Sequence, residues 1–158
     1  MLREKKAKIA LYVWYVAIAA TSLFPVDGMG LHQGCTLIER LSYPFLHQNV
    51  FHALCNIFVF NQCYRFMPQC RNLAVFYIFA ISYPFSSDMP IVGMSGVVYA
   101  YMGYIAPNVE RKAIYNLTIA TYIAIGFVFP NMAVGNHIYC YILGLLWGYL
   151  NAPLCRDK

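Results

Sequence analysis

Residues 91–100 read IVGMSGVVYA. In this run the hydroxyl group of Ser95 lies between Gly93 and Gly96, with almost nothing polar around it. A later apolar stretch carries a lone histidine, His137. Polar groups of this kind are costly to keep in hydrocarbon unless they serve a function. A serine, a histidine and suitable hydrogen-bond donors are the groups that acyl transfer requires. The two residues therefore raise the hypothesis of a serine nucleophile that works inside a membrane.

The composition is typical of a membrane protein. The chain has 158 residues, of which 61% are hydrophobic and 11% charged, and its mean hydropathy is +0.55. An ordinary soluble domain of this length is less apolar and carries more charge. We therefore predict one domain, residues 1–158, in an all-α membrane protein. Its six candidate transmembrane helices are residues 9–24, 50–64, 73–85, 96–106, 113–129 and 138–150.

Several of these spans are shorter than the ~20 residues that a typical bilayer requires, so we expect local thinning of the lipid or re-entry of flanking loops. The first span also has an alternative. Residues 3–20, with their basic start and small-residue end, resemble a cleavable signal peptide. We favour an uncleaved span because the apolar run continues through Leu23 and Phe24.

The basic residues predict the topology. When alternate loops are assigned to opposite sides, only Arg40 falls on one side. The other ten of the eleven are Arg3, Lys5, Lys6, Lys8, Arg65, Arg71, Arg111, Lys112, Arg156 and Lys158. The positive-inside rule then places both termini in the cytoplasm and the loops with Arg40, Asp88 and Asn131 outside. This distribution accounts for the net charge of +5, so no nucleic-acid partner is predicted.

The cysteines favour buried packing over disulfides. The six are Cys35, Cys55, Cys63, Cys70, Cys140 and Cys155. Only Cys35 falls clearly in an outward loop, which argues against a disulfide framework. We expect them to act as small hydrophobic residues.

Four polar residues are predicted to lie at a similar depth. His52 and Asn56 are four positions apart, so they share one helix face. Ser95 stands at or near the first turn of the fourth span, and His137 stands at the head of the sixth. Since the second, fourth and sixth spans all enter from outside, all four residues are expected in the outer half of the membrane.

Each of these features has a structural alternative. His52 and Asn56 can form a polar clamp between helices, and His137 can simply begin a helix. The glycines of residues 93–96, followed by Ala100 and Gly103, can form a close-packing face. The presence of all these polar residues at one depth favours a catalytic site over the structural alternatives.

That chemistry is acyl transfer by a Ser–His dyad. At a helix N-terminus Ser95 has free backbone N–H groups and the positive end of the helix dipole beside it, and both suit an oxyanion. His52 and Asn56 can donate to the same oxygen. Asp88 and Glu110 fall in loops, so no acidic third member is expected.

Three further features are expected to support the dyad. Gly93 lets the backbone approach a substrate closely. Tyr99 lies four positions after Ser95, so its ring can stack on the imidazole of His137. On the sixth span the small residues Cys140, Gly144 and Gly148 follow His137 on one helix stripe, which permits close contact with the fourth span.

Together these motifs resemble the rhomboid family of intramembrane serine proteases. They comprise His47-x4-His52-x3-Asn56, Gly93-x-Ser95-Gly96 with residues 97–100, and His137 with its trailing stripe. Order and spacing agree over about residues 40–150. The sequence differs from the family pattern in having Ile38-Glu39 before Arg40, where an aromatic residue is frequent, and Cys140 in place of a glycine.

The resemblance implies a six-helix bundle, a Ser95 nucleophile and His137 as general base and acid. It also implies an oxyanion hole formed by His52, Asn56 and the Ser95 N–H. Substrates would be single-pass, membrane-anchored proteins whose transmembrane segment unwinds near the outer face, often with a small residue before the cut. No metal or cofactor is implied. The expected location is a bacterial inner membrane, with both termini cytoplasmic.

Two other classes of function compete with this hypothesis. The first is a catalytically silent rhomboid-like protein that binds or escorts membrane clients, which a lost serine or histidine would favour. The second is a small transporter, but paired intramembrane carboxylates are missing from the spans.

Overall fold

The computed structural model describes residues 2–24, 26, 28–66, 73–84, 89–128 and 132–151. Within these ranges the secondary structure is helical, apart from one isolated antiparallel bridge between Leu31 and Ile91. The all-α prediction is therefore confirmed. In chain order the elements are α1 (Leu2–Thr21), α2 (Leu37–Ser42), the 3-10 helix η1 (Tyr43–Phe45), α3 (Val50–Phe66), α4 (Leu73–Ile81), α5 (Ser95–Ile105), the 3-10 helix η2 (Ala106–Asn108), α6 (Lys112–Gly126) and α7 (Val134–Asn151).

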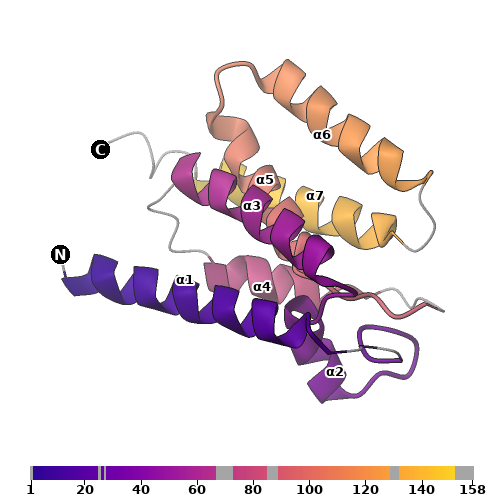
Figure 1. The fold of residues 1–158 in the computed structure, drawn as a ribbon. Helices are drawn as coiled ribbons and strands as arrows, with labels where there is room; N and C mark the ends of the chain where they lie inside the picture. Colours follow the sequence, from indigo (N-terminus) through magenta and orange to yellow (C-terminus); the bar gives the residue numbers. More distant parts are fainter. Residues whose placement is uncertain are drawn as a thin grey trace.

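Helix α5 lies at the centre of the bundle and packs against α7, α4 and α3. Helix α1 covers α3, and α6 lies on the outside against η2 and α7. Figure 1 shows that α3, α5 and α7 all begin at the same end of the bundle. The residues at the starts of these three helices are thereby brought to a common level.

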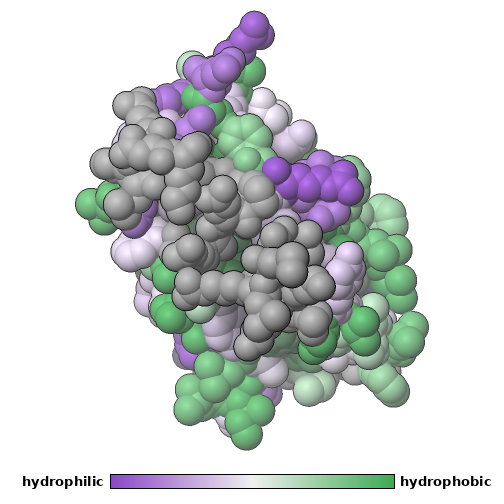
Figure 2. Space-filling view, turned by 90° about the vertical axis from the view of Figure 1, so that its left-hand side faces the viewer, coloured by the Kyte–Doolittle hydropathy of each residue, from purple (hydrophilic) through white to green (hydrophobic). Residues whose placement is uncertain are grey.

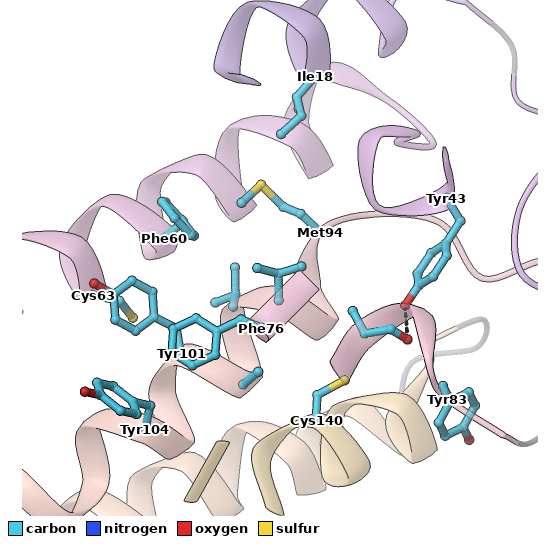
Figure 3. Close-up of a cluster of buried hydrophobic side chains, with 14 of the residues drawn as sticks. Ile18, Tyr43, Phe60, Cys63, Phe76, Tyr83, Met94, Tyr101, Tyr104 and Cys140 are labelled. Atoms are coloured by element: carbon cyan, nitrogen blue, oxygen red, sulfur yellow. Dashed lines mark hydrogen bonds between the residues drawn. The ribbon is translucent and has the colours of Figure 1, made fainter. Parts of the chain in front are cut away.

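Aromatic side chains hold α5 to its neighbours. The ring of Tyr101 lies 5.0 Å from that of Phe76 on α4 and 5.7 Å from that of Phe60 on α3. All three residues are buried, and Figure 3 shows them together in the core. Each such ring pair stabilises a fold by about 0.5–1.5 kcal/mol beyond the area that it buries. This cluster fixes the position of α5, and hence of Ser95 at its first residue.

The outer segment of α2 and η1 is anchored on the end of α4. The guanidinium of Arg40 donates to the main-chain carbonyls of Ile81 and Tyr83, both at 3.0 Å. The hydroxyl of Tyr43 donates to the carbonyl of Ala80 at 2.8 Å, and that of Tyr77 donates to the carbonyl of Leu41 at 2.5 Å. The last carbonyls of a helix lack partners within the helix, and these bonds supply partners at that end; the carbonyl of Ala80 also accepts the N–H of Tyr83 at 3.3 Å.

The six predicted spans correspond in position to α1, α3, α4, α5, α6 and α7. The main difference is α4, which ends at Ile81 although the apolar run continues to residue 85. Tyr83 precedes Pro84, and a residue before proline disfavours the helical conformation, so the helix stops short.

None of the helices in the described part of the chain is both long and apolar enough to cross a membrane. Helices α4 and α5 have only 9 and 11 residues. Helix α1 has 20 residues, but its first part includes several basic residues. The six transmembrane spans therefore stay a prediction. Several residues used for the topology and the cysteine assignment lie outside the described residues, namely Cys70, Arg71, Asp88, Asn131, Cys155, Arg156 and Lys158.

Candidate active site

Ser95 and His137 come from different helices and meet. Ser95 is the first residue of α5, and His137 lies in the first turn of α7. The Oγ atom of Ser95 is 2.9 Å from Nε2 of His137. At this distance the imidazole is placed to take the hydroxyl proton as the serine attacks a carbonyl carbon.

The ring of Tyr99 lies on the imidazole of His137, as expected from its position one turn after Ser95. The two ring centroids are 4.3 Å apart and the planes differ by 21°, which is a stacked arrangement. His137 itself is only 4% exposed. Stacking on one side and burial on the other restrict the rotation of the imidazole.

Gly93 brings two hydrogen-bond donors toward the backbone just before Ser95. Its φ is +109°, a conformation that favours glycine. A Cβ atom at this position would lie 2.9 Å from Cε1 of His52 and 3.3 Å from Nδ2 of Asn56. Both space and backbone conformation therefore require glycine, and the side chains of His52 and Asn56 lie directly against it.

One polar atom in each of these two side chains is unsatisfied. Nδ2 of Asn56 and Nδ1 of His52 are buried and have no hydrogen-bond partner among the described residues. A buried polar group without a partner costs about 1–3 kcal/mol. The Asn56 amide N–H, which has no partner among the described residues and lies near Ser95, is suited to an oxygen on which negative charge develops, and a protonated ring nitrogen of His52 can donate in the same way.

These residues line a cavity of about 500 Å³ that is bounded by α3, α5, α6 and α7. Its walls include Tyr122 on α6 and Met132, together with the four polar residues of the site, His52, Asn56, Ser95 and His137. Most of the remaining lining is apolar. A cavity of this size is in the range of ligand sites, which typically combine apolar walls with a few convergent polar groups.

His47 is a buried site residue to which the sequence motif alone assigned no role. Its Nε2 atom accepts the N–H of Met94 at 3.3 Å, and Nδ1 lies 3.3 Å from the carbonyl of Phe45. These two contacts fit a neutral ring that carries its proton on Nδ1 and donates it to Phe45. The N–H of Gly93 also donates, to the carbonyl of Tyr43 at 3.0 Å. The backbone N–H groups of Gly93 and Met94, just before Ser95, are thus held by η1 and by His47, which follows it.

The small-residue stripe of α7 brings two helix backbones together. A Cβ atom on Gly144 would overlap the carbonyl oxygen of Ala100 on α5. One on Gly148 would lie 2.6 Å from the carbonyl oxygen of Tyr104. Cys140, the departure from an all-glycine stripe, is fully buried with its sulfur against Gly96. The expected close contact between the two helices is present.

Comparisons with known proteins give one distant similarity. The chain is similar to the rhomboid protease GlpG of Haemophilus influenzae, with 28% identity over 139 residues, which covers 75% of this chain and 71% of that protein. No family model matches the chain. No solved structure matches it either. The similarity agrees with the resemblance noted in the sequence and extends over most of the chain.

Proposed function

We propose that this protein is a rhomboid-type intramembrane serine endopeptidase, which cleaves transmembrane segments of single-pass membrane proteins near the outer face of the membrane. The observation that carries the proposal is the 2.9 Å contact between Ser95 Oγ and His137 Nε2 on the wall of a cavity. The similarity to the rhomboid protease supports the same class.

In the proposed reaction, His137 Nε2 removes the hydroxyl proton while Ser95 Oγ attacks the scissile carbonyl carbon. The negative oxygen that forms accepts hydrogen bonds from Asn56, His52 and the Ser95 N–H. His137 then gives its proton to the leaving amine, and the other half of the substrate remains as an ester on Ser95. A water molecule, deprotonated by His137, hydrolyses this ester and releases a carboxylate product.

The exposed surface supports a lipid environment. Large apolar side chains point outward from several helices, and hydrophobic residues lie along the lower and right-hand edges of the face in Figure 2. They include Val13, Val16, Phe51, Leu54, Phe58, Ile114, Leu117, Ile142, Leu146 and Leu150. Large exposed apolar patches are rare on monomeric soluble proteins, and exposed apolar side chains of this size and number fit a lipid-covered surface. In our proposal lipid covers these side chains, local thinning accommodates the short helices, and both termini lie in the cytoplasm of a bacterium.

Covalent labelling tests the proposed function. We expect a fluorophosphonate to modify the detergent-purified protein at Ser95, because a serine activated by His137 attacks such reagents. Mass spectrometry of the labelled peptides locates the adduct, and Ser82, an exposed serine on the same chain, serves as the internal control. A folded protein that takes up no label at Ser95 would contradict the proposal and favour the silent, client-binding alternative.

Asn56→Ala is expected to lower turnover with little change in thermal stability. The amide nitrogen of Asn56 has no hydrogen-bond partner among the residues that the structure describes, so its loss breaks none of the described hydrogen bonds. Loss of one oxyanion donor costs ~10²- to 10³-fold in soluble proteases, and we expect a smaller loss because His52 and the Ser95 N–H remain.

A matched control is Asn116→Ala, which removes the acceptor of the Tyr141 hydroxyl between α6 and α7. That variant should lose more stability than Asn56→Ala and less turnover. The opposite ranking, with Asn56→Ala fully active but melting much lower, would assign Asn56 to a structural clamp.

A further inference from the structure

A chain of buried polar side chains lies behind the serine and histidine. It is formed by Tyr43, Asn136 and Cys140, none of which is more than 1% exposed. The Tyr43 hydroxyl donates to the carbonyl of Ala80 and accepts from Nδ2 of Asn136 at 3.4 Å. The Oδ1 atom of Asn136 in turn accepts from the Cys140 thiol at 3.6 Å. Figure 3 shows the hydrogen bond of the Tyr43 hydroxyl as a dashed line, with Cys140 in the same part of the core.

Asn136 lies beside both of the backbone segments that carry the dyad. It immediately precedes His137 in the first turn of α7. Its Oδ1 atom also lies against Gly96, the residue after Ser95, because a Cβ atom on Gly96 would come within 2.5 Å of it. One carboxamide therefore separates the backbone that carries the serine from the backbone that carries the histidine.

The anchoring matters because the first turn of a helix lacks half of its backbone hydrogen bonds and frays easily. Rotation of this turn would move the His137 imidazole and would also break the bond between Asn136 and Tyr43. Since a buried amide without a partner is costly, the bond opposes that rotation. Tyr43 is itself held by Ala80 on α4, so the first turn of α7 is tied to α4 through η1.

We propose that Asn136 is a positioning residue for the Ser95–His137 pair and that Tyr43 is its anchor. This inference rests on the proposed function and deepens it. The carboxamide sets the separation of the two backbones, and the hydroxyl of Tyr43 sets the rotation of the helix turn that carries His137.

Inactivation kinetics with a fluorophosphonate test the inference, with the limiting rate kinact resolved from the binding constant KI. Asn136→Leu keeps a similar volume but makes no hydrogen bonds, and we expect kinact to fall ~10²-fold, as for a shift of ~1 Å between reacting groups. Tyr43→Phe, the milder variant, should lower kinact ~10-fold, and the double variant should be no slower than Asn136→Leu because the two residues act as one unit. KI should stay unchanged in all three.

Tyr77→Phe is the matched control. It also deletes a hydroxyl that bonds α4 to the outer segment, but the acceptor of that hydroxyl is the carbonyl of Leu41. Its kinact should equal that of the wild type. If Tyr43→Phe and Asn136→Leu also keep the wild-type kinact and only melt at lower temperature, the network is merely structural and the inference is overturned.

A spectroscopic readout separates this inference from the proposed function. In protein labelled with ¹⁵N-histidine, Ser95→Ala should move the Nε2 resonance of His137, because the contact at 2.9 Å is lost. In the Asn136→Leu and Tyr43→Phe backgrounds the same substitution should move it less. The shift can be smaller in both variant backgrounds than in the wild-type background while the wild-type protein takes up no fluorophosphonate. In that case the proposed function fails and the positioning role stands. An equal shift in all backgrounds overturns the positioning role whether or not Ser95 is reactive.

Discussion

Ser95→Ala and His137→Ala should each abolish cleavage of a single-span test substrate while the protein remains folded. Ser95 Oγ and His137 Nε2 lie 2.9 Å apart and act as one unit, so neither residue supports catalysis when the other is removed. In soluble serine proteases such a loss is on the order of 10⁶-fold in kcat, and here it would fall below detection. The measurement is cleavage of the single-span test substrate by each purified variant in detergent or liposomes, with both fragments detected on a gel.

The double variant should be no less active than either single variant, because the losses do not add. Ser82→Ala and His32→Ala are matched controls, since both residues lie outside the cavity and each replacement removes the same chemical group. Both controls should retain full activity. Cleavage above background by purified Ser95→Ala would rule out the proposed mechanism.

The parts of the site that depend on local geometry were predictable from the sequence. A spacing of four residues along a helix places His52 with Asn56, and Ser95 with Tyr99, on one face whatever the tertiary structure. The glycines around Ser95 likewise indicated a close approach of backbone, which the contacts of Gly93 and the α7 stripe display. Periodicity thus indicates which residues share a face.

Periodicity does not indicate which helix covers that face or where a loop returns. The contact of His47 with the Met94 N–H joins residues 47 positions apart, and that of Asn136 with Tyr43 joins residues 93 positions apart. Neither pair has a spacing that local rules connect. The anchoring of Arg40 on the end of α4 is also a tertiary contact, since it joins residues 41 and 43 positions apart.

Gly144→Leu should leave the protein inserted and folded but remove both cleavage and fluorophosphonate labelling of Ser95. Gly144 lies two turns after His137 on the same face of α7, and even a Cβ atom there would overlap the backbone of Ala100 on α5. Unlike a flexible side chain, a backbone carbonyl cannot turn aside, so the helices themselves must separate. Overpacking of this kind typically costs 1–3 kcal/mol, about the size that a folded bundle tolerates.

The functional loss should exceed the loss of stability because the histidine is on one of the separated helices and the serine on the other. A displacement of ~1 Å between a base and its nucleophile costs on the order of 10²-fold in rate. Ala120→Leu, which adds a leucine on the exposed face of α6, is the control for bulk alone and should label like the wild type. Thermal melting of both variants, beside the labelling rate, separates displacement from unfolding. If Gly144→Leu labels as fast as the wild type, the backbone contact between α5 and α7 does not set the distance from His137 to Ser95.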